Sequence, residues 1–128
     1  MDDDLGRWAD PSLLVMTSLA AGPKHGYAIM QDVASQAGVR LGPGTLYGVI
    51  SRLEQRGLIE PLAAHDRRRP YRITAEGSRV LAAQLHRMRK VAETGLGRLA
   101  GAAWSAARPG AGARIRPAVA RAAVWERA

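Results

Sequence analysis

The sequence predicts a mainly α-helical fold (α+β class) that carries one small β-hairpin and ends in a long helix. Apolar residues recur at helical spacing in three short segments between residues 10 and 57. Two short runs typical of strands follow, joined by a polar, basic loop. Leucines then repeat at steps of mostly three and four between residues 75 and 100. With 128 residues, the chain is long enough for one domain and an extension.

The first helix is expected to begin at Asp10-Pro11, because aspartate caps a helix N-terminus and proline suits the first helical position. The apolar residues of segment 13–19 point in nearly all directions around this helix, so it should be buried on more than one side. Gly22-Pro23 combines a glycine C-cap with a helix breaker, and this pair should end the helix.

The second helix is predicted from about His25 to Ala37, and Gly38 should stop it. Its inward stripe consists of four residues at helical spacing: Ile29, Met30, Val33 and Ala37. The three residues 39–41 that follow are long enough for only a minimal strand.

The third helix should open at Gly42-Pro43 and end at Gly57. Its core stripe is Leu46, Ile50 and Leu53. The opposite face is small and polar: it carries Gly44, Gly48, Ser51, Arg52 and Gln55, with Thr45 and Tyr47 on its flanks. A glycine inside a helix costs about 1 kcal/mol relative to alanine. Something beyond helix stability should therefore favour glycine on this face, and close approach to another surface is one such reason.

The residues 58–62 and 71–74 are predicted to be two strands, with loop 63–70 between them. Pro70 should lie at the start or edge of its strand, because it cannot donate a hydrogen bond to the ladder. The loop carries three consecutive arginines: Arg67, Arg68 and Arg69. Three helices followed by a hairpin give a winged helix-turn-helix domain over residues 10–74, in which the hairpin is the wing.

Thr74 can cap a long helix over residues 75–100. Its apolar residues form a seam like that of a coiled coil: Leu81, Leu85, Met88, Ala92, Leu96 and Leu99. The three-helix unit is complete without this seam, so a second copy of the chain is the expected partner, with Leu14 joining the dimer interface. Residues 101–128 are predicted to be an Ala/Arg-rich tail that is either a short helix or disordered.

The charge is distributed unevenly along the chain. The net charge is +8, but residues 1–60 carry −2 (5 Lys/Arg, 7 Asp/Glu) and residues 61–128 carry +10 (14 Lys/Arg, 4 Asp/Glu). A basic half favours a polyanionic partner, although a general preference for arginine would give the same composition. The chain has no cysteine, so disulfides and thiolate metal sites are excluded. No apolar run reaches the roughly 18–20 residues that span a bilayer, so no membrane partner is expected.

A helix-turn-helix places its second helix in the major groove of DNA. The polar face of the third helix suits that position, because its glycines let the helix approach closely and Thr45 and Ser51 can bond a phosphate or a base edge. Arg52 is the best candidate for a bidentate guanine contact. The wing arginines can reach neighbouring phosphates or the minor groove, although alone they would be read as a solvated loop.

Five stretches in this order and spacing make residues 13–77 resemble the PadR family of bacterial transcriptional regulators. They are Leu13-Leu14-Val15-Met16, Gly22-Pro23-Lys24-His25-Gly26-Tyr27, Pro43-Gly44-Thr45-Leu46-Tyr47, Arg52-Leu53-Glu54 with Gly57-Leu58-Ile59, and Arg67-Arg68-Arg69-Pro70-Tyr71-Arg72-Ile73-Thr74-Ala75-Glu76-Gly77. The resemblance implies a homodimeric repressor that binds an operator and is often released by a small molecule. It also implies that His25 and Tyr27 touch backbone phosphate. The sequence departs from the family pattern at Gly42, a weaker cap than the usual serine, and at Pro70.

Two other readings of the domain stay open: a winged-helix module that binds protein, and a nonspecific DNA-binding protein. No histidine has a second ligand at metal spacing, and no catalytic grouping or phosphate-binding loop is present, so neither enzyme activity nor a cofactor is expected. Trp8 and Trp104 either pack helix ends or line a pocket for a small aromatic effector. A DNA-binding regulator of this kind is expected in the bacterial cytoplasm, at the nucleoid.

Overall fold

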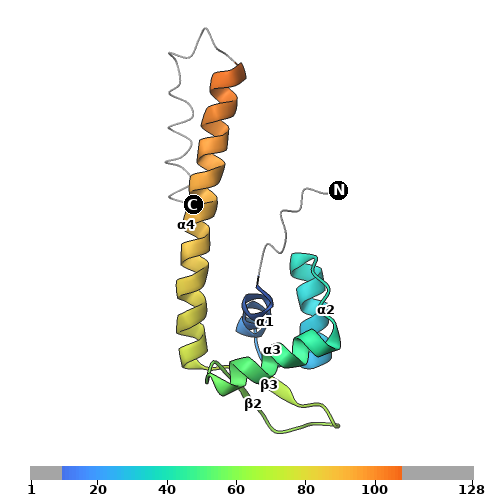
Figure 1. Cartoon of the computed structure of the whole chain (residues 1–128). Helices are drawn as coiled ribbons and strands as arrows, with labels where there is room; N and C mark the ends of the chain where they lie inside the picture. Colours follow the sequence, from blue (N-terminus) through green and yellow to red (C-terminus); the bar gives the residue numbers. More distant parts are fainter. Residues whose placement is uncertain (1–9, 108–128) are drawn as a thin grey trace. The chain divides into compact units, whose positions relative to one another are not determined.

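The computed structural model describes residues 10–107, and it confirms the predicted fold class (Figure 1). Residues through Gln84 belong to one compact unit and residues from Leu85 onward to a second. In chain order the elements are α1 (Pro11–Ala20), β1 (Lys24–His25), α2 (Gly26–Ala37), α3 (Pro43–Gln55), β2 (Ile59–Pro61), β3 (Pro70–Ile73) and α4 (Ala75–Ala107). Within the described residues, no helix is long and apolar enough to cross a membrane.

The central helix of the first unit is α1, which packs against α2, α3 and β3. As predicted, it is buried on most sides: the buried residues are Leu13, Leu14, Val15, Met16, Ser18 and Leu19. Asp10 caps it, because its Oδ1 accepts a hydrogen bond from the Ser12 backbone N–H at 3.2 Å. Burial of almost every apolar side chain of α1 makes this helix the core on which the other elements are positioned.

The ends of α2 and α3 follow the predicted signals. Gly38 closes α2 in the left-handed conformation at φ +70°, which glycine adopts without steric cost. Pro43 occupies the first turn of α3, and Gly42 before it provides no side-chain cap, as the sequence implied. Four residues of α3 are buried in the core: Leu46, Val49, Ile50 and Leu53.

The sheet has three antiparallel strands in the order β1-β3-β2. The predicted strand at 39–41 is wrong: this segment is not a strand, and Leu41 within it is buried in the core. The third strand is instead β1, in which Lys24 pairs with Tyr71 and His25 pairs with Pro70. A two-residue strand shows no alternation of apolar and polar residues, so its existence depends on β3 being placed beside it.

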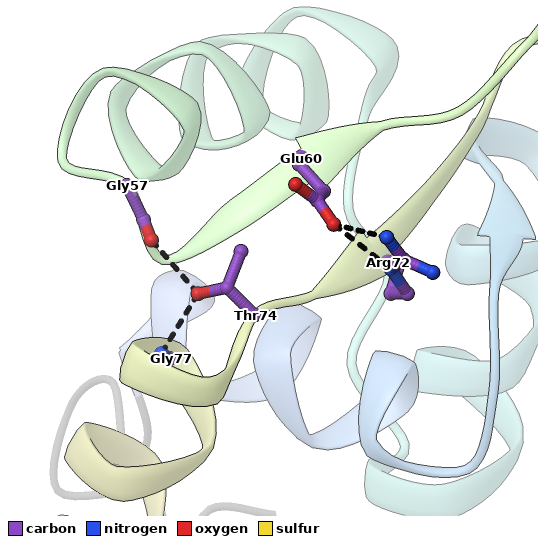
Figure 2. Close-up of polar contacts among 5 residues, drawn as sticks. All are labelled: Gly57, Glu60, Arg72, Thr74 and Gly77. Atoms are coloured by element: carbon purple, nitrogen blue, oxygen red, sulfur yellow. Dashed lines mark hydrogen bonds and ion pairs between the residues drawn. The ribbon is translucent and has the colours of Figure 1, made fainter.

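The hairpin of β2 and β3 is tied to the first turn of α4 (Figure 2). The hydroxyl of Thr74 accepts a hydrogen bond from the Gly77 N–H at 3.0 Å and donates one to the Gly57 carbonyl at 2.8 Å. The cap predicted for Thr74 is therefore present. Between the two strands, Arg72 forms an ion pair with its cross-strand neighbour Glu60.

The long helix α4 extends to Ala107, beyond the predicted range of 75–100. Residues 101–107 therefore belong to the helix and not to the tail that was expected from residue 101. Alanine and arginine are good helix formers, so this composition does not mark a helix end. The rest of the predicted tail, residues 108–128, lies outside the described residues.

Candidate nucleic-acid interface

The outward face of α3 carries all six residues predicted for the recognition surface. Five of them are exposed and Gly48 is half-buried. The exposed residues are Gly44, Thr45, Tyr47, Ser51 and Arg52. Because the buried stripe of the same helix anchors it to the core, this polar face is presented to solvent on a rigid element.

The two glycines of this face are not required by packing within the described chain. A Cβ atom built on Gly44 would meet nothing within 4 Å, and one built on Gly48 would meet only the Arg52 Nη1 atom, at 3.9 Å. Alanine in place of either glycine would stabilise the helix by about 1 kcal/mol through its higher helix propensity. Glycine at Gly44 and Gly48 therefore has no structural explanation inside the subunit, which agrees with a surface shaped for close approach to a partner.

Tyr47 is held against the first residue of α2. A Cβ atom built on Gly26 would lie 2.2 Å from the Tyr47 hydroxyl oxygen, so any larger residue here would displace the phenol from this position. The Tyr47 side chain is nevertheless half exposed. Gly26 is thus a positioning residue for the recognition face that sequence reasoning missed, and its only sequence signal was a glycine at the start of a helix.

Tyr71 of β3 is in the electrostatic neighbourhood of Tyr47. Burial, and next the charge of Glu54, raise the pKa of Tyr71 above its ordinary value, whereas Arg69 acts in the opposite direction. Tyr47 contributes a smaller upward effect on the same pKa. Tyr71 therefore stays protonated where an exposed tyrosine would begin to ionise.

His25 caps α2. Its Nδ1 atom accepts a hydrogen bond from the Ala28 backbone N–H at 3.4 Å, and its Nε2 atom lies 3.3 Å from the Arg68 Nη1 atom of the hairpin. Tyr27 beside it is 59% exposed, and its hydroxyl accepts a hydrogen bond from Gln31 Nε2 at 3.4 Å. Both residues for which the family resemblance implied phosphate contacts therefore carry accessible polar groups near the N-terminus of α2.

The wing is a hairpin with a two-residue turn. His65 and Arg68 exchange both backbone hydrogen bonds, at 2.7 and 2.9 Å, around Asp66 and Arg67. Both central residues have positive φ angles, 52° for Asp66 and 67° for Arg67, as a type I′ turn requires. Asn-Gly is the preferred pair in such turns, so Arg67 is strained by about 1–2 kcal/mol.

The three wing arginines have different surroundings. Arg69 donates a hydrogen bond to the Leu62 carbonyl at 3.0 Å, and Arg68 lies against His25. Arg67 makes no hydrogen bond or ion pair to any residue that the structure describes. The guanidinium of Arg67, at the tip of the turn, is thus the wing cation with the greatest freedom to reach a phosphate.

A hollow of about 480 Å³ lies between the wing turn and the start of α2. Its lining residues are His25, His65, Asp66, Arg68 and Pro70. His65 Nε2 lies 3.9 Å from an Asp66 carboxylate oxygen, and both side chains are exposed. In residues 10–107 no group of three or more acidic, histidine or cysteine side chains could hold a metal ion.

The residues predicted to form the dimer interface fall into a buried group and a more exposed group. Leu14 and Leu81 are already buried within the chain, at 8% and 4% exposure, and so contribute to the core of the first unit. In the second unit, Leu96 and Leu99 are 55% and 68% exposed and Leu85 is also exposed, with Ala92 exposed and Met88 half-buried between them. This surface of α4 is thus apolar and open over several turns.

Of the two tryptophans predicted to line an effector pocket, Trp104 is half-buried near the end of α4. Trp8 lies outside the described residues, so its part of the prediction stays untested.

The Transcriptional regulator PadR-like family matches residues 15–83 of the chain, more than half of its length. A PadR family transcription regulator from Clostridium difficile R20291 is 24% identical, with a TM-score of 0.61 over 66% of this chain and 92% of that chain. A transcriptional regulator from Clostridium thermocellum is 25% identical, with a TM-score of 0.58 over 62% and 83% of the two chains.

A curated relative is the "Uncharacterized 37.1 kDa protein in transposon TN4556" of Streptomyces fradiae. It is 42% identical over 85 residues, which is 66% of this chain. The matched region spans a quarter of the length of that relative. The likeness therefore concerns only part of that larger protein.

Proposed function

Because the chain belongs to the PadR-like family of transcriptional regulators, we propose that it is a repressor that binds a palindromic operator as a homodimer. As a member of this family, the chain is a DNA-binding transcriptional regulator with a winged-helix fold. The observation that supports the proposed contact with DNA is the outward face of α3, which is polar and exposed and carries two glycines that packing within the subunit does not require.

In the proposed complex, α3 lies in the major groove, and Arg52 reads a guanine with its planar guanidinium. The wing follows the adjacent backbone, with Arg67 at its tip as the phosphate contact. His25 and Tyr27 add phosphate contacts from the start of α2. This division separates a residue that reads sequence from residues that only position the protein on the duplex.

The homodimer is proposed to form through the second unit, because α4 exposes Leu85, Leu96 and Leu99 along its length. A two-fold symmetric dimer would present two α3 helices to half-sites about one helical turn of DNA apart, or a multiple of it. The proposed effector, a small aromatic compound near Trp104, and the expected place of action at the bacterial nucleoid both stay predictions.

The experiment that tests the function is selection of bound sites from random DNA, because it reports specificity and symmetry together. We expect a palindromic consensus and an affinity that falls steeply with salt. A family of bound fragments without a shared sequence would identify a nonspecific DNA-binding protein. No binding at low ionic strength would instead favour a module that binds an acidic protein.

The division of roles is tested by Arg52→Ala and Arg67→Ala, with Arg89→Ala in the second unit as a charge-matched control. Arg52→Ala should relax preference at one base pair by about 1–3 kcal/mol. Arg67→Ala should weaken binding to all sequences alike and lower the salt slope by about 1. Equal losses of specificity in both variants would contradict the assignment.

A further inference from the structure

We propose that the hollow between the wing turn and α2 is a phosphate-binding site in which His25 and Arg68 hold one phosphate group together. The proposal rests on the proposed function where the phosphate is part of DNA, and it extends that function to phosphate that is free in solution. It starts from the contact between His25 Nε2 and Arg68 Nη1, which are 3.3 Å apart.

The N-terminus of α2 determines which nitrogen of His25 carries the proton. The backbone N–H of Ala28 can only donate, so the His25 Nδ1 atom that it meets must accept through a lone pair. A neutral imidazole with an unprotonated Nδ1 carries its proton on Nε2. The side of the ring that faces Arg68 is therefore a hydrogen-bond donor.

Arginine has only donors, so the contact joins two N–H groups and no acceptor. Such a contact is unfavourable by itself and becomes favourable when one acceptor receives both hydrogen bonds. His25 and Arg68 both line the same hollow of about 480 Å³, which gives such an acceptor room to enter. The observation that points to a ligand is thus that two donors, from residues 43 positions apart in the sequence, meet at the wall of one cavity.

A phosphate group fits this arrangement better than a neutral acceptor. It offers several oxygens, so it can accept from the imidazole and the guanidinium at once, and its negative charge strengthens both bonds. The single carboxylate among the lining residues, that of Asp66, lies 3.9 Å from His65 Nε2 and makes no hydrogen bond to His25 or Arg68. The cavity volume also lies within the range of about 300–1,000 Å³ that is usual for small-molecule sites.

The shared ligand would connect the wing to the helix-turn-helix. Arg68 belongs to the wing turn, whereas His25 belongs to β1 and caps the helix that supports α3. A phosphate held by both would fix the wing relative to α2 through charge-assisted hydrogen bonds. The source is either the DNA backbone or a free phosphate compound, and the experiment separates the two.

The first arm uses the isotope-labelled full-length chain without DNA. Inorganic phosphate is titrated against chloride at fixed pH and equal ionic strength, and long-range ¹⁵N–¹H correlation reports the protonation of each His25 nitrogen. We expect a proton on Nε2 and a saturable shift of the His25 signals, which Arg68→Gln abolishes. Arg89→Gln removes the same charge on α4, at a residue that does not line the hollow, and should retain the shift. Acetate should produce no saturable shift.

The second arm is a double-mutant cycle on DNA binding with His25→Asn and Arg68→Gln. Asparagine keeps a good N-cap for α2 while it removes the imidazole. Each change should lower DNA affinity by about tenfold, and the double variant should lose little more, because both residues hold one phosphate. The control pair Arg52→Gln and Arg68→Gln, which lie on different elements, should be additive.

Saturable binding of inorganic phosphate supports the site with free phosphate as its ligand. Energetic coupling between His25 and Arg68 in DNA binding, without saturable binding of inorganic phosphate, supports the site with the DNA backbone as the source of the phosphate. A proton found on Nδ1 rather than Nε2 overturns the proposal, and so does the absence of both phosphate saturation and coupling on DNA. If the chain fails to bind DNA at all, the phosphate titration still decides the site, so the two proposals fail separately.

Discussion

Replacing Gly77 by alanine is expected to destabilise the fold strongly, although alanine is normally the better helix former. A Cβ atom at this position would lie 2.0 Å from the Leu58 carbonyl oxygen and 2.9 Å from Ile73 Cγ1. The nearer atom belongs to the backbone of the segment that enters β2, so it cannot rotate away as a side chain would. The first turn of α4 and that segment would have to separate until the contact reached about 3.4 Å, where ordinary van der Waals contact begins.

The magnitude follows from the contacts that this separation disturbs. The Thr74 N–H donates to the Leu58 carbonyl at 3.0 Å, and the Thr74 hydroxyl bonds both Gly57 and Gly77 (Figure 2). Overpacking costs about 1–3 kcal/mol, and each weakened hydrogen bond adds roughly 0.5–1.5 kcal/mol. We therefore expect Gly77→Ala to lower the free energy of unfolding by about 3 kcal/mol. For a domain of this size that corresponds to a fall of roughly 10–20 °C in melting temperature.

The assay is urea and thermal unfolding followed by circular dichroism, at one protein concentration because dimerisation would add to apparent stability. Gly97→Ala on the same helix is the matched control, since its Cβ would meet nothing within 4 Å. That control should be neutral or more stable by up to about 1 kcal/mol. If Gly77→Ala were as stable as the parent chain, the close approach of α4 to the Leu58 carbonyl would be refuted.

Three other changes test separate parts of the account. Arg67→Gly should raise the free energy of unfolding by up to about 1 kcal/mol, because glycine adopts a positive φ without strain, whereas affinity for DNA should fall. A variant that is less stable in urea than the parent chain would contradict the turn geometry. Folding raises the pKa of Tyr71 above 10.0, its ordinary value, so the native state holds the phenol proton more tightly than the unfolded chain does. The contribution of this proton to the free energy of unfolding is complete below pH 10.0 and is lost as the pH rises through the raised pKa. Tyr71→Phe should therefore reduce the alkaline decline in unfolding free energy, and an identical decline in both chains would count against burial of the phenol. If the chain forms the proposed dimer, Leu96→Asp combined with Leu99→Asp should convert it to monomers in sedimentation experiments, and a dimer that persists would place the interface elsewhere.

The sequence predicted the elements whose signals are local. Asp10, Pro43 and Thr74 begin helices, and Gly38 ends one, because capping and backbone conformation depend on neighbours within a few residues. The polar face of α3 was predicted for the same reason, since helical periodicity alone separates a buried stripe from an exposed one.

Two predictions were wrong, for residues 39–41 and for the C-terminal end of α4, because no local sequence signal there determines the structure. The segment 39–41 had apolar residues but no partner strand, so Leu41 became part of the core instead. The C-terminal limit of α4 was placed at residue 100, although the composition beyond it still favours helix through Ala107.

Only the tertiary structure decided which distant residues meet. The two-residue strand β1 exists because β3 lies beside it, and His25 faces Arg68 because the wing folds back toward α2. Tyr47 lies over Gly26 in a position that a Cβ atom on residue 26 would occupy. Such contacts join segments separated by tens of residues, and chain packing rather than local conformational preference sets their geometry.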